Sequence, residues 1–329
     1  MKILFATYPM AFHTPGGGEI QLLAYKSALE KKGITVDLMD QWSPNFMNYD
    51  IVHFFSCMGG SIHFCNFIKQ LGLPLVISSS LWITPETKQL YPVDEIRAQL
   101  ELADVVITNS EMENDTLSSV LSLPREKFSA VYNGVEDIFF NDRPSANIFR
   151  SVYDLNEKFI LNVANIEPRK NQLNLVKAMK AFPDKKLIII GHIRNKKYLE
   201  EIMCLENSEQ VYYAGPLEHD SVLLRSAYQA CDLFCLPSTL ETPGLAALEA
   251  RAQGAKLVVT AEGSTKEYFS DFGFYCDFSS VESIIKNISD CLKFNTSLIH
   301  GEKIYNWPDA TNSLVDIYEK INKREKHEI

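Results

Sequence analysis

Short, continuously apolar segments alternate with helical segments along almost the whole chain, and this alternation restricts the fold more than any other feature of the sequence. A short apolar run with no polar residue at every second position is typical of a strand that is buried on both faces. Such runs are expected as strands at 2–7, 35–39, 51–55, 73–78, 105–109, 128–132, 158–164, 186–190, 210–214, 232–236 and 256–260. Because helical segments separate them, the sequence predicts an α/β protein whose parallel sheets are covered by helices on both faces.

The segments between these runs carry apolar residues at helical spacing. They predict helices at 19–32, 61–71, 93–103, 110–121, 173–182, 196–206, 221–230, 244–252, 281–292 and 311–326. Ser110 is followed three residues later by Glu113, which predicts a capping box at the start of one helix. The irregular stretch 133–157 interrupts the alternation and divides it into two series. A length of 329 residues is sufficient for two domains.

Composition and charge exclude several classes of protein. Hydrophobic residues make up 46% of the chain, which allows a sizeable core, and the net charge of −10 argues against nucleic acid as a partner. The same negative charge gives no support for docking on an anionic membrane, so at most peripheral membrane contact is expected. Apolar residues that would serve such contact, or would instead belong to the core, are Phe12, Trp42, Phe46 and Trp82.

Targeting and cysteine signals favour a cytoplasmic protein. The first residues form a short apolar run without the length of a signal peptide, and no run approaches the length that crosses a bilayer. The seven cysteines have neither a CxxC pair nor zinc-ligand spacing. We therefore expect buried thiols in a reducing compartment.

Two glycine-rich or basic segments follow predicted strands. Gly16 and Gly17 stand between the first strand and the first helix, where backbone N–H groups face an anion or where a flexible turn is needed. Arg169 and Lys170 stand between the strand 158–164 and the next helix. Adjacent cations at the carboxyl end of a strand suit a diphosphate, whereas the alternative is a solvated basic pair.

Two carboxylates flank the start of another helix. Glu241 follows the strand 232–236, and Glu249 lies inside the helix 244–252, for which Thr242 is the expected N-cap and Pro243 the first residue. A carboxylate only accepts hydrogen bonds and therefore suits hydroxyl groups. Glu241 is interpreted as an acceptor for sugar hydroxyls and Glu249 as an acceptor for a vicinal diol such as ribose. The alternative is a solvent-facing acid and an incidental helical glutamate.

Five segments of the sequence resemble motifs of a known family. LPSTLETPGLAALEARAQGAKLVVTAEGSTKEYF (236–269) resembles the E-x7-E region of the retaining glycosyltransferases of family 4, which have the GT-B fold. Four further segments are similar to family motifs in the same order: PGGGE (15–19), VYNGVED (131–137), EPRKNQ (167–172) and YNWPDATNSLVDIYEKI (305–321). The resemblance covers nearly the whole chain and is specific in its C-terminal half.

The resemblance implies a domain arrangement. It implies two facing Rossmann-like domains, an acceptor-side domain at 1–145 and a nucleotide-sugar domain at 146–308. The last segment, 309–329, would be a C-terminal helix that packs back on the first domain. A ligand of such α/β domains is expected at the carboxyl ends of the strands.

The resemblance also implies residue roles. Arg169 and Lys170 would neutralise the diphosphate, and Glu241 would contact the sugar of the sugar nucleotide. Glu249 would hold the ribose. Backbone groups would complete the site: Gly244 and Leu245 near sugar and phosphate, Gly215 in the segment AGPLE (214–218) near the base, and Gly16 and Gly17 over the phosphates.

The chain departs from the family pattern at two places. Many relatives carry Gly-Arg where this chain has Ala164-Asn165, and the role of that arginine would pass to Arg169. Many relatives also have a histidine in the first domain, where this chain has the serines of VISSSLW (76–82). Ser80 and His53 are therefore the acceptor-side candidates, with a merely buried histidine as the alternative for His53.

The sequence thus predicts transfer of a sugar from a nucleoside-diphosphate sugar to an acceptor hydroxyl, with retention of the anomeric configuration and without a metal or another cofactor. The expected partners are the nucleotide-sugar donor and a glycan or glycoconjugate acceptor, as in the synthesis of surface polysaccharides. Two alternatives remain at this point: a nucleotide-sugar epimerase of the same fold, and an inactive nucleotide-sugar-binding module.

Overall fold

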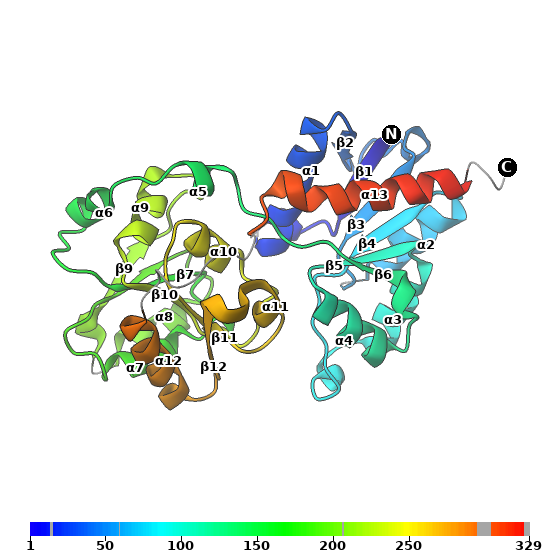
Figure 1. The fold of residues 1–329 in the computed structure, drawn as a ribbon. Helices are drawn as coiled ribbons and strands as arrows, with labels where there is room; N and C mark the ends of the chain where they lie inside the picture. Colours follow the sequence, from blue (N-terminus) through cyan, green and yellow to red (C-terminus); the bar gives the residue numbers. More distant parts are fainter. Residues whose placement is uncertain (14–15, 59, 206, 295–303, 326–329) are drawn as a thin grey trace. The chain divides into compact units, whose positions relative to one another are not determined.

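The computed structural model describes residues 1–13, 16–58, 60–205, 207–294 and 304–325 (Figure 1). The described chain divides into two compact units. The first unit contains the residues up to Gly134 together with those from Tyr305 onward, and the second runs from Val135 to Ile304. The first unit thus ends earlier than the expected boundary at 145, and it takes up the chain again before 309. Residues 326–329 of the expected C-terminal segment and 295–303 of the expected second domain lie outside the described residues.

The first unit contains a six-stranded parallel sheet. Its strands are β1 (Lys2–Thr7), β2 (Thr35–Leu38), β3 (Ile51–Phe55), β4 (Leu75–Ser78), β5 (Val105–Thr108) and β6 (Phe128–Ala130). They lie in the order β2-β1-β3-β4-β5-β6, and Ile3 of β1 is in register with Ile51 of β3. The order reverses between β1 and β3, which makes the carboxyl ends of these two strands the expected place for a ligand in this sheet.

Five longer helices accompany this sheet. They are α1 (Gly17–Lys31), α2 (Ile62–Gln70), α3 (Val93–Leu102), α4 (Glu111–Leu121) and α13 (Trp307–Glu325). The last of these packs beside α1 although the two are separated by most of the sequence (Figure 1). Tyr318 of α13 is completely buried and its hydroxyl lies 2.5 Å from Nδ1 of His53, so the end of the chain completes the core of the first unit.

The second unit contains another six-stranded parallel sheet. Its strands are β7 (Ile160–Val163), β8 (Leu187–Ile190), β9 (Val211–Gly215), β10 (Leu233–Leu236), β11 (Leu257–Thr260) and β12 (Gly273–Cys276). The order is β12-β11-β10-β7-β8-β9, with Leu233 of β10 in register with Ile160 of β7. This is the order of a Rossmann sheet, and it reverses between β7 and β10.

The helices of the second unit are α5 (Ile138–Asn141), α6 (Ala146–Val152), α7 (Gln172–Met179), α8 (Lys196–Met203), α9 (Val222–Ala230), α10 (Leu245–Ala252), α11 (Thr265–Phe269) and α12 (Val281–Lys293). Most of them lie between successive strands, whereas α5 and α6 precede β7 and α12 follows β12. Two buried apolar clusters cover the two faces of the sheet: Ile188 and Ile190 of β8 belong to one, and Leu187 and Ile189 to the other. The continuous apolar strands of the sequence therefore reflect a sheet that is covered on both sides, as predicted.

The predicted elements are present, and four short ones were missed. Helices α5 and α6 fall in the stretch that was read as irregular, and α11 and β12 follow the last predicted strand. These elements have four to seven residues, which is too short for a periodic pattern to stand out. Helix α4 begins as expected, because Ser110 Oγ accepts a hydrogen bond from Glu113 N–H at 3.0 Å.

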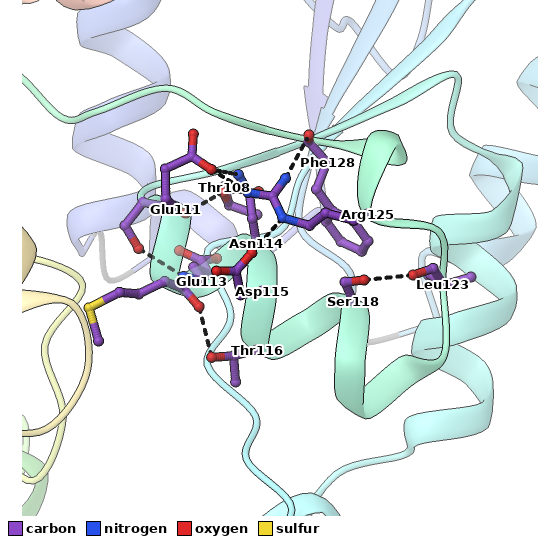
Figure 2. A network of polar contacts seen from close by, with 12 residues as sticks. Thr108, Glu111, Glu113, Asn114, Asp115, Thr116, Ser118, Leu123, Arg125 and Phe128 are labelled. Atoms are coloured by element: carbon purple, nitrogen blue, oxygen red, sulfur yellow. Dashed lines mark hydrogen bonds and ion pairs between the residues drawn. The ribbon is translucent and has the colours of Figure 1, made fainter.

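A polar network surrounds the start of α4 (Figure 2). Arg125 forms ion pairs with Glu111 and with Asp115, the latter at 2.6 Å, and so ties the segment after α4 back to its first turns. Thr108 Oγ1 donates to Asn114 Oδ1 at 2.6 Å beneath this surface. A buried hydrogen bond thus joins strand β5 to helix α4, and exposed ion pairs join α4 to the segment that follows it.

None of the helices in the described part of the chain combines the length and the apolar character needed to cross a bilayer. All seven cysteines are free thiols, and all but Cys204 are buried, which agrees with the expectation of structural thiols.

Candidate functional site

The polar residues singled out in the second half of the chain meet at the reversal point of the second sheet. Arg169 and Lys170 form the end of a short 3-10 turn between β7 and α7, and Glu241 lies in the segment between β10 and α10. Because β7 and β10 are neighbours in the sheet, their carboxyl ends bring these two segments side by side. This crevice is where ligands of Rossmann domains bind.

Lys170 and Glu241 form a close ion pair. The Lys170 Nζ atom lies 2.5 Å from Glu241 Oε1, and the two side chains are only 13% and 6% exposed. Burial by itself would raise the pKa of the Glu241 carboxyl. The positive charges of Lys170 and Arg169 outweigh that effect and hold this pKa below its ordinary value. Glu241 is therefore a carboxylate at neutral pH, able to accept hydrogen bonds and unable to supply a proton.

Arg169 is the more exposed of the two cations. Its side chain is 50% exposed, and its guanidinium lies 4.0 Å from Glu241 Oε1 and 3.3 Å from Glu167 Oε1. The backbone carbonyl of Arg169 accepts a hydrogen bond of 2.8 Å from Thr239 N–H, which joins the two segments of the crevice. An exposed guanidinium that is already surrounded by acidic groups on one side presents its remaining N–H donors to solvent or to an anion.

The backbone around Glu241 is fixed by a close approach to Gly263. Glu241 and Gly263 form a parallel bridge, and Ser264 N–H donates to the Glu241 carbonyl at 3.1 Å. Gly263 has φ +91°, and a Cβ atom there would lie 2.1 Å from the Glu241 carbonyl oxygen. A side chain at position 263 is therefore excluded, and the glycine allows the loop to hold Glu241 in place.

Helix α10 begins two residues later than predicted. Thr242 and Pro243 precede the helix, Gly244 is the N-cap with φ +88°, and Leu245 is the first helical residue. The predicted N-cap at Thr242 was wrong because Gly244 has a conformation outside the right-handed helical region, so the helix cannot extend back through it. A Cβ at Gly244 would lie 3.2 Å from Glu241 Oε2, so the Glu241 carboxylate lies beside the start of this helix.

Glu249 lies on α10 and is held by two side chains from other parts of the same unit. Its Oε1 atom lies 2.7 Å from Nε2 of His219, and its Oε2 atom accepts a hydrogen bond of 3.0 Å from the Tyr228 hydroxyl. The Glu249 side chain is 8% exposed, whereas His219 is 42% exposed. The pKa of the His219 imidazole is raised, chiefly by its hydrogen bond to Glu249.

His219 was missed by sequence reasoning. It lies between β9 and α9, just after Gly215, which ends β9 with φ +79° and has open space where a side chain would project. The segment 214–218 was expected near a nucleobase, and the nearest histidine could have been included with it. No local pattern links position 219 to position 249, because only the packing of α9, α10 and the segment after β9 brings them together.

The first unit has its own cavity at the reversal point between β1 and β3. It has a volume of about 320 Å³ and is lined by residues from the ends of β1, β3 and β4 and from the start of α1: Thr7, Tyr8, Gly18, Glu19, Leu22, Phe55, Ser56, Met58, Ser78, Ser79, Ser80 and Leu81. Ser80, an acceptor-side candidate from the sequence analysis, is thus at the cavity, and its role toward an acceptor stays a prediction. Glu113 of α4 fixes this side of the cavity, since its Oε1 accepts from Ser79 Oγ and from Leu81 N–H at 3.0 Å each.

His53 was expected on the acceptor side, but it does not line this cavity, so that expectation is corrected. Its side chain is completely buried, with Nδ1 against the Tyr318 hydroxyl at 2.5 Å and Nε2 against Ser78 Oγ at 2.8 Å. Its ring stacks on Phe55. Burial lowers the pKa of His53 to about 3, so the imidazole is neutral and structural.

The backbone N–H group of Gly16, before α1, already binds a carboxylate of the protein itself. Gly16 is the N-cap of α1, and its N–H donates to Glu19 Oε2 at 2.6 Å. Gly17 begins the helix and is exposed, with open space around it. The predicted contact of an external anion with Gly16 N–H would require Glu19 to move, and the predicted contact with Gly17 stays a prediction.

No group of three or more His, Cys, Asp or Glu side chains that are placed to hold a metal ion occurs in the described ranges. Whether the protein needs a metal stays a prediction.

Comparison with known proteins shows what the second unit is similar to. Residues 145–300 match the family model of Glycosyl transferases group 1, a match that includes Arg169, Lys170, Glu241 and Glu249. The second unit is therefore similar to the Glycosyl transferases group 1 domain. An uncharacterized glycosyltransferase of Methanocaldococcus jannaschii is 27% identical over 65% of this chain and 59% of that protein. The chain spans about half the length of the curated relatives that it matches.

Solved structures of the same architecture extend over both units. A sucrose-phosphate synthase from Thermosynechococcus elongatus has a TM-score of 0.80 at 17% identity, covering 98% of this chain and 99% of that one. The Anabaena protein HepE, solved in complex with UDP-glucose, has a TM-score of 0.73 at 19% identity over 99% and 100% of the two chains. The fold is GT-B, with two Rossmann-like units, as the sequence predicted.

Proposed function

We propose that this protein is a retaining glycosyltransferase that moves a sugar from a nucleoside-diphosphate sugar to an acceptor hydroxyl, in the assembly of a polysaccharide or glycoconjugate. The proposal rests on one observation: Lys170, Arg169 and Glu241 lie together where the strand order reverses between β7 and β10. This place lies within the segment that matches the group 1 family model. We place the protein in the cytoplasm because its buried cysteines are unpaired thiols.

The basic residues act on the leaving group. Negative charge grows on the diphosphate as the bond to the sugar breaks, and preorganised cations nearby stabilise that charge in the transition state. Lys170 is fixed by its ion pair with Glu241, and the exposed Arg169 guanidinium offers a pair of N–H donors to phosphate oxygens. These residues supply the charge stabilisation without a metal ion.

Glu241 acts as a hydrogen-bond acceptor for sugar hydroxyls. Its lowered pKa keeps it ionised, so it does not serve as a general acid at neutral pH. Its partner Lys170 occupies one side of Oε1, while Oε2 lies beside the start of α10. We infer that the acceptor hydroxyl attacks on the face from which the diphosphate leaves, with a leaving phosphate oxygen as the base, which retains the configuration.

The cavity of the first unit is the proposed acceptor site. Its polar lining consists of hydroxyl groups and one carboxylate, that of Glu19, together with the aromatic rings of Tyr8 and Phe55. This composition suits a neutral, hydroxyl-bearing sugar. None of the described lining residues is basic, so a phosphorylated or carboxylated acceptor would meet Glu19 without a compensating cation.

The test is a variant of the basic pair. Lys170→Ala should lower the transfer rate by about 10²–10³-fold, since it removes one preorganised group at the developing charge. Because this change leaves Glu241 buried without its closest cation, the double variant Lys170→Ala/Glu241→Gln serves to separate loss of chemistry from loss of folding. Lys177→Ala, which changes an exposed lysine of α7, is the matched control and should keep full activity.

Activity is followed by mass spectrometry of products formed from a panel of nucleotide sugars and neutral glycoside acceptors, and the anomeric configuration is read by NMR. Full turnover of Lys170→Ala would reject the role of the basic pair. A nucleotide sugar that is converted to its epimer without any acceptor would reject the transferase and identify an epimerase instead.

A further inference from the structure

We propose that His219 is a positioning residue of the donor site, which together with Tyr228 orients the Glu249 carboxylate toward the ribose diol of the nucleotide. This inference rests on the proposed function and adds to it a residue outside the E-x7-E segment. It predicts that nucleotide affinity depends on the protonation of one histidine.

The geometry around Glu249 leaves room for a ligand. Each carboxylate oxygen has one protein partner, His219 Nε2 at 2.7 Å for Oε1 and the Tyr228 hydroxyl at 3.0 Å for Oε2. A carboxylate can accept about four hydrogen bonds. One acceptor position therefore remains on each oxygen, which matches the two neighbouring hydroxyl groups of a ribose.

Three elements contribute to this arrangement. Glu249 belongs to α10, Tyr228 to α9, and His219 to the segment between β9 and α9. Tyr228 is 1% exposed and donates to Glu249 Oε2 from the core, whereas the His219 side chain is 42% exposed. The Oε1 side of the carboxylate is therefore the side that solvent and a ligand reach. Rotation of the carboxylate out of this orientation would break one of the two contacts.

The charged groups around His219 are acidic. Glu249, Glu136 and Asp220 all favour its protonated form, and the ring of Phe139 from α5 lies against it at 5.4 Å. Tyr228 reaches the same carboxylate and is a neutral phenol, because burial raises its pKa well above the ordinary value. The imidazole therefore stays protonated to a higher pH than an exposed histidine, and it then holds Glu249 through a charge-assisted hydrogen bond.

The sign of the pH effect follows from these charges. Protonated His219 holds Glu249 through a charge-assisted hydrogen bond, with Nε2 2.7 Å from Oε1. As pH rises through the raised pKa of His219, this hold on Glu249 weakens. Nucleotide affinity should therefore fall at alkaline pH in the wild-type protein, and this fall should be absent when position 219 cannot titrate.

The experiment is isothermal titration calorimetry on the full-length protein with EDTA present. UDP, GDP, ADP and TDP are compared first, and the tightest binder is then titrated between pH 5.5 and 9. Inorganic pyrophosphate is the second probe because it lacks the ribose and reports only on the diphosphate contacts. The variants are His219→Gln, Tyr228→Phe and Glu249→Gln. His63→Gln, which changes an exposed histidine on α2, is the matched control.

We expect His219→Gln to weaken nucleotide binding by about tenfold at pH 6.5, in line with the loss of one charge-assisted hydrogen bond. Pyrophosphate binding should change by less than about twofold, because the change acts through the ribose contact. Tyr228→Phe, which removes a single oxygen, should act in the same direction and guards against a folding defect at position 219. His63→Gln should behave as wild type.

The outcomes separate this inference from the proposed function. If Glu249→Gln weakens the nucleotide while His219→Gln leaves both its affinity and its pH profile unchanged, the role of His219 is rejected and the donor site stands. If His219→Gln weakens pyrophosphate as much as nucleotide, the histidine acts on the diphosphate or on folding, and the inference is likewise rejected. If the wild-type protein binds neither probe, the proposed function fails together with the inference.

Discussion

At the scale of single residues, environment assigns different roles to two acids that are eight positions apart. Glu241 faces the cations Lys170 and Arg169, whereas Glu249 is held by an imidazole and a phenol. The first carboxylate belongs to a charge cluster in which the two cations, and not the acid, suit a phosphate. The second is a hydrogen-bond acceptor with fixed orientation, suited to neutral hydroxyl groups. A carboxylate by itself does not determine which of these it becomes.

A buried histidine gives the first unit a pH-dependent stability. Burial lowers the pKa of His53 to about 3, while an unfolded histidine titrates near 6.5. Below pH 6.5 the unfolded chain therefore binds a proton that the folded chain does not. The free energy of unfolding should fall by up to about 1.4 kcal/mol per pH unit as pH decreases from 6.5 toward 3, from this residue alone.

Urea unfolding at a series of pH values tests this expectation. His53→Gln should lower stability at neutral pH, because its contacts to Tyr318 and Ser78 are altered, yet it should flatten the slope between pH 6.5 and 4. The exposed His63→Gln should leave the slope as in wild type. Equal acid slopes in wild type and His53→Gln would contradict the prediction.

At the scale of elements, helix ends position the functional groups. Helix α10 begins at Leu245 because Gly244 takes a positive φ, and this places the helix start next to the Glu241 carboxylate. Helix α1 begins at Gly17, and Glu19 in its first turn accepts from Gly16 N–H. The start of α10 therefore lies beside the carboxylate of a loop residue, Glu241. The start of α1 is covered by the carboxylate of Glu19, which belongs to its own first turn.

Helix α4 allows the cost of a cap to be compared with that of surface ion pairs (Figure 2). Ser110→Ala removes the buried oxygen that accepts from Glu113 N–H and should cost about 1 kcal/mol of stability. Arg125→Ala removes two ion pairs, but the arginine is 40% exposed, so its loss should cost no more than about 1 kcal/mol and become smaller at high salt.

Urea unfolding of both variants in low salt and in about 0.5 M salt distinguishes the two cases, because a screening length of several ångström weakens exposed pairs only. A larger loss for Arg125→Ala than for Ser110→Ala at high salt would show that the ion-pair network, and not the cap, stabilises the start of α4.

At the scale of the whole molecule, the chain leaves the first unit at Gly134 and returns to it from Tyr305 onward. The returning helix α13 supplies buried side chains, among them Trp307 next to Tyr25 and Tyr318 next to His53. The core of the first unit therefore depends on contacts between residues that are far apart in the sequence.

Tyr318→Ala should therefore destabilise the first unit. The side chain is fully buried, and removal of a large buried aromatic group typically costs about 3–5 kcal/mol. Hydrogen–deuterium exchange read by mass spectrometry should show faster exchange in peptides from β1, β3 and α1. Peptides from β7, β8 and β10 should keep their protection.

Lys320→Ala, an exposed change on the same helix, is the control and should leave both units as they are. Protection that is lost equally in both units of Tyr318→Ala would contradict the assignment of α13 to the first unit.

The sequence by itself determined the strands, most helices and the loops that carry the basic pair and the two glutamates. These elements follow from the local periodicity of apolar residues and from residues a few positions away. Both can be read from a short stretch of the sequence. The motifs also placed Arg169, Lys170 and Glu241 correctly after their strands.

Only the tertiary structure decided which side chains meet. The pairing of Lys170 with Glu241 follows from the adjacency of β7 and β10, and that of His219 with Glu249 from the packing of three elements. The same holds for the burial of His53 beneath a helix from the end of the chain. Sheet order and helix packing are set by burial of the whole core, a long-range property that no local pattern contains.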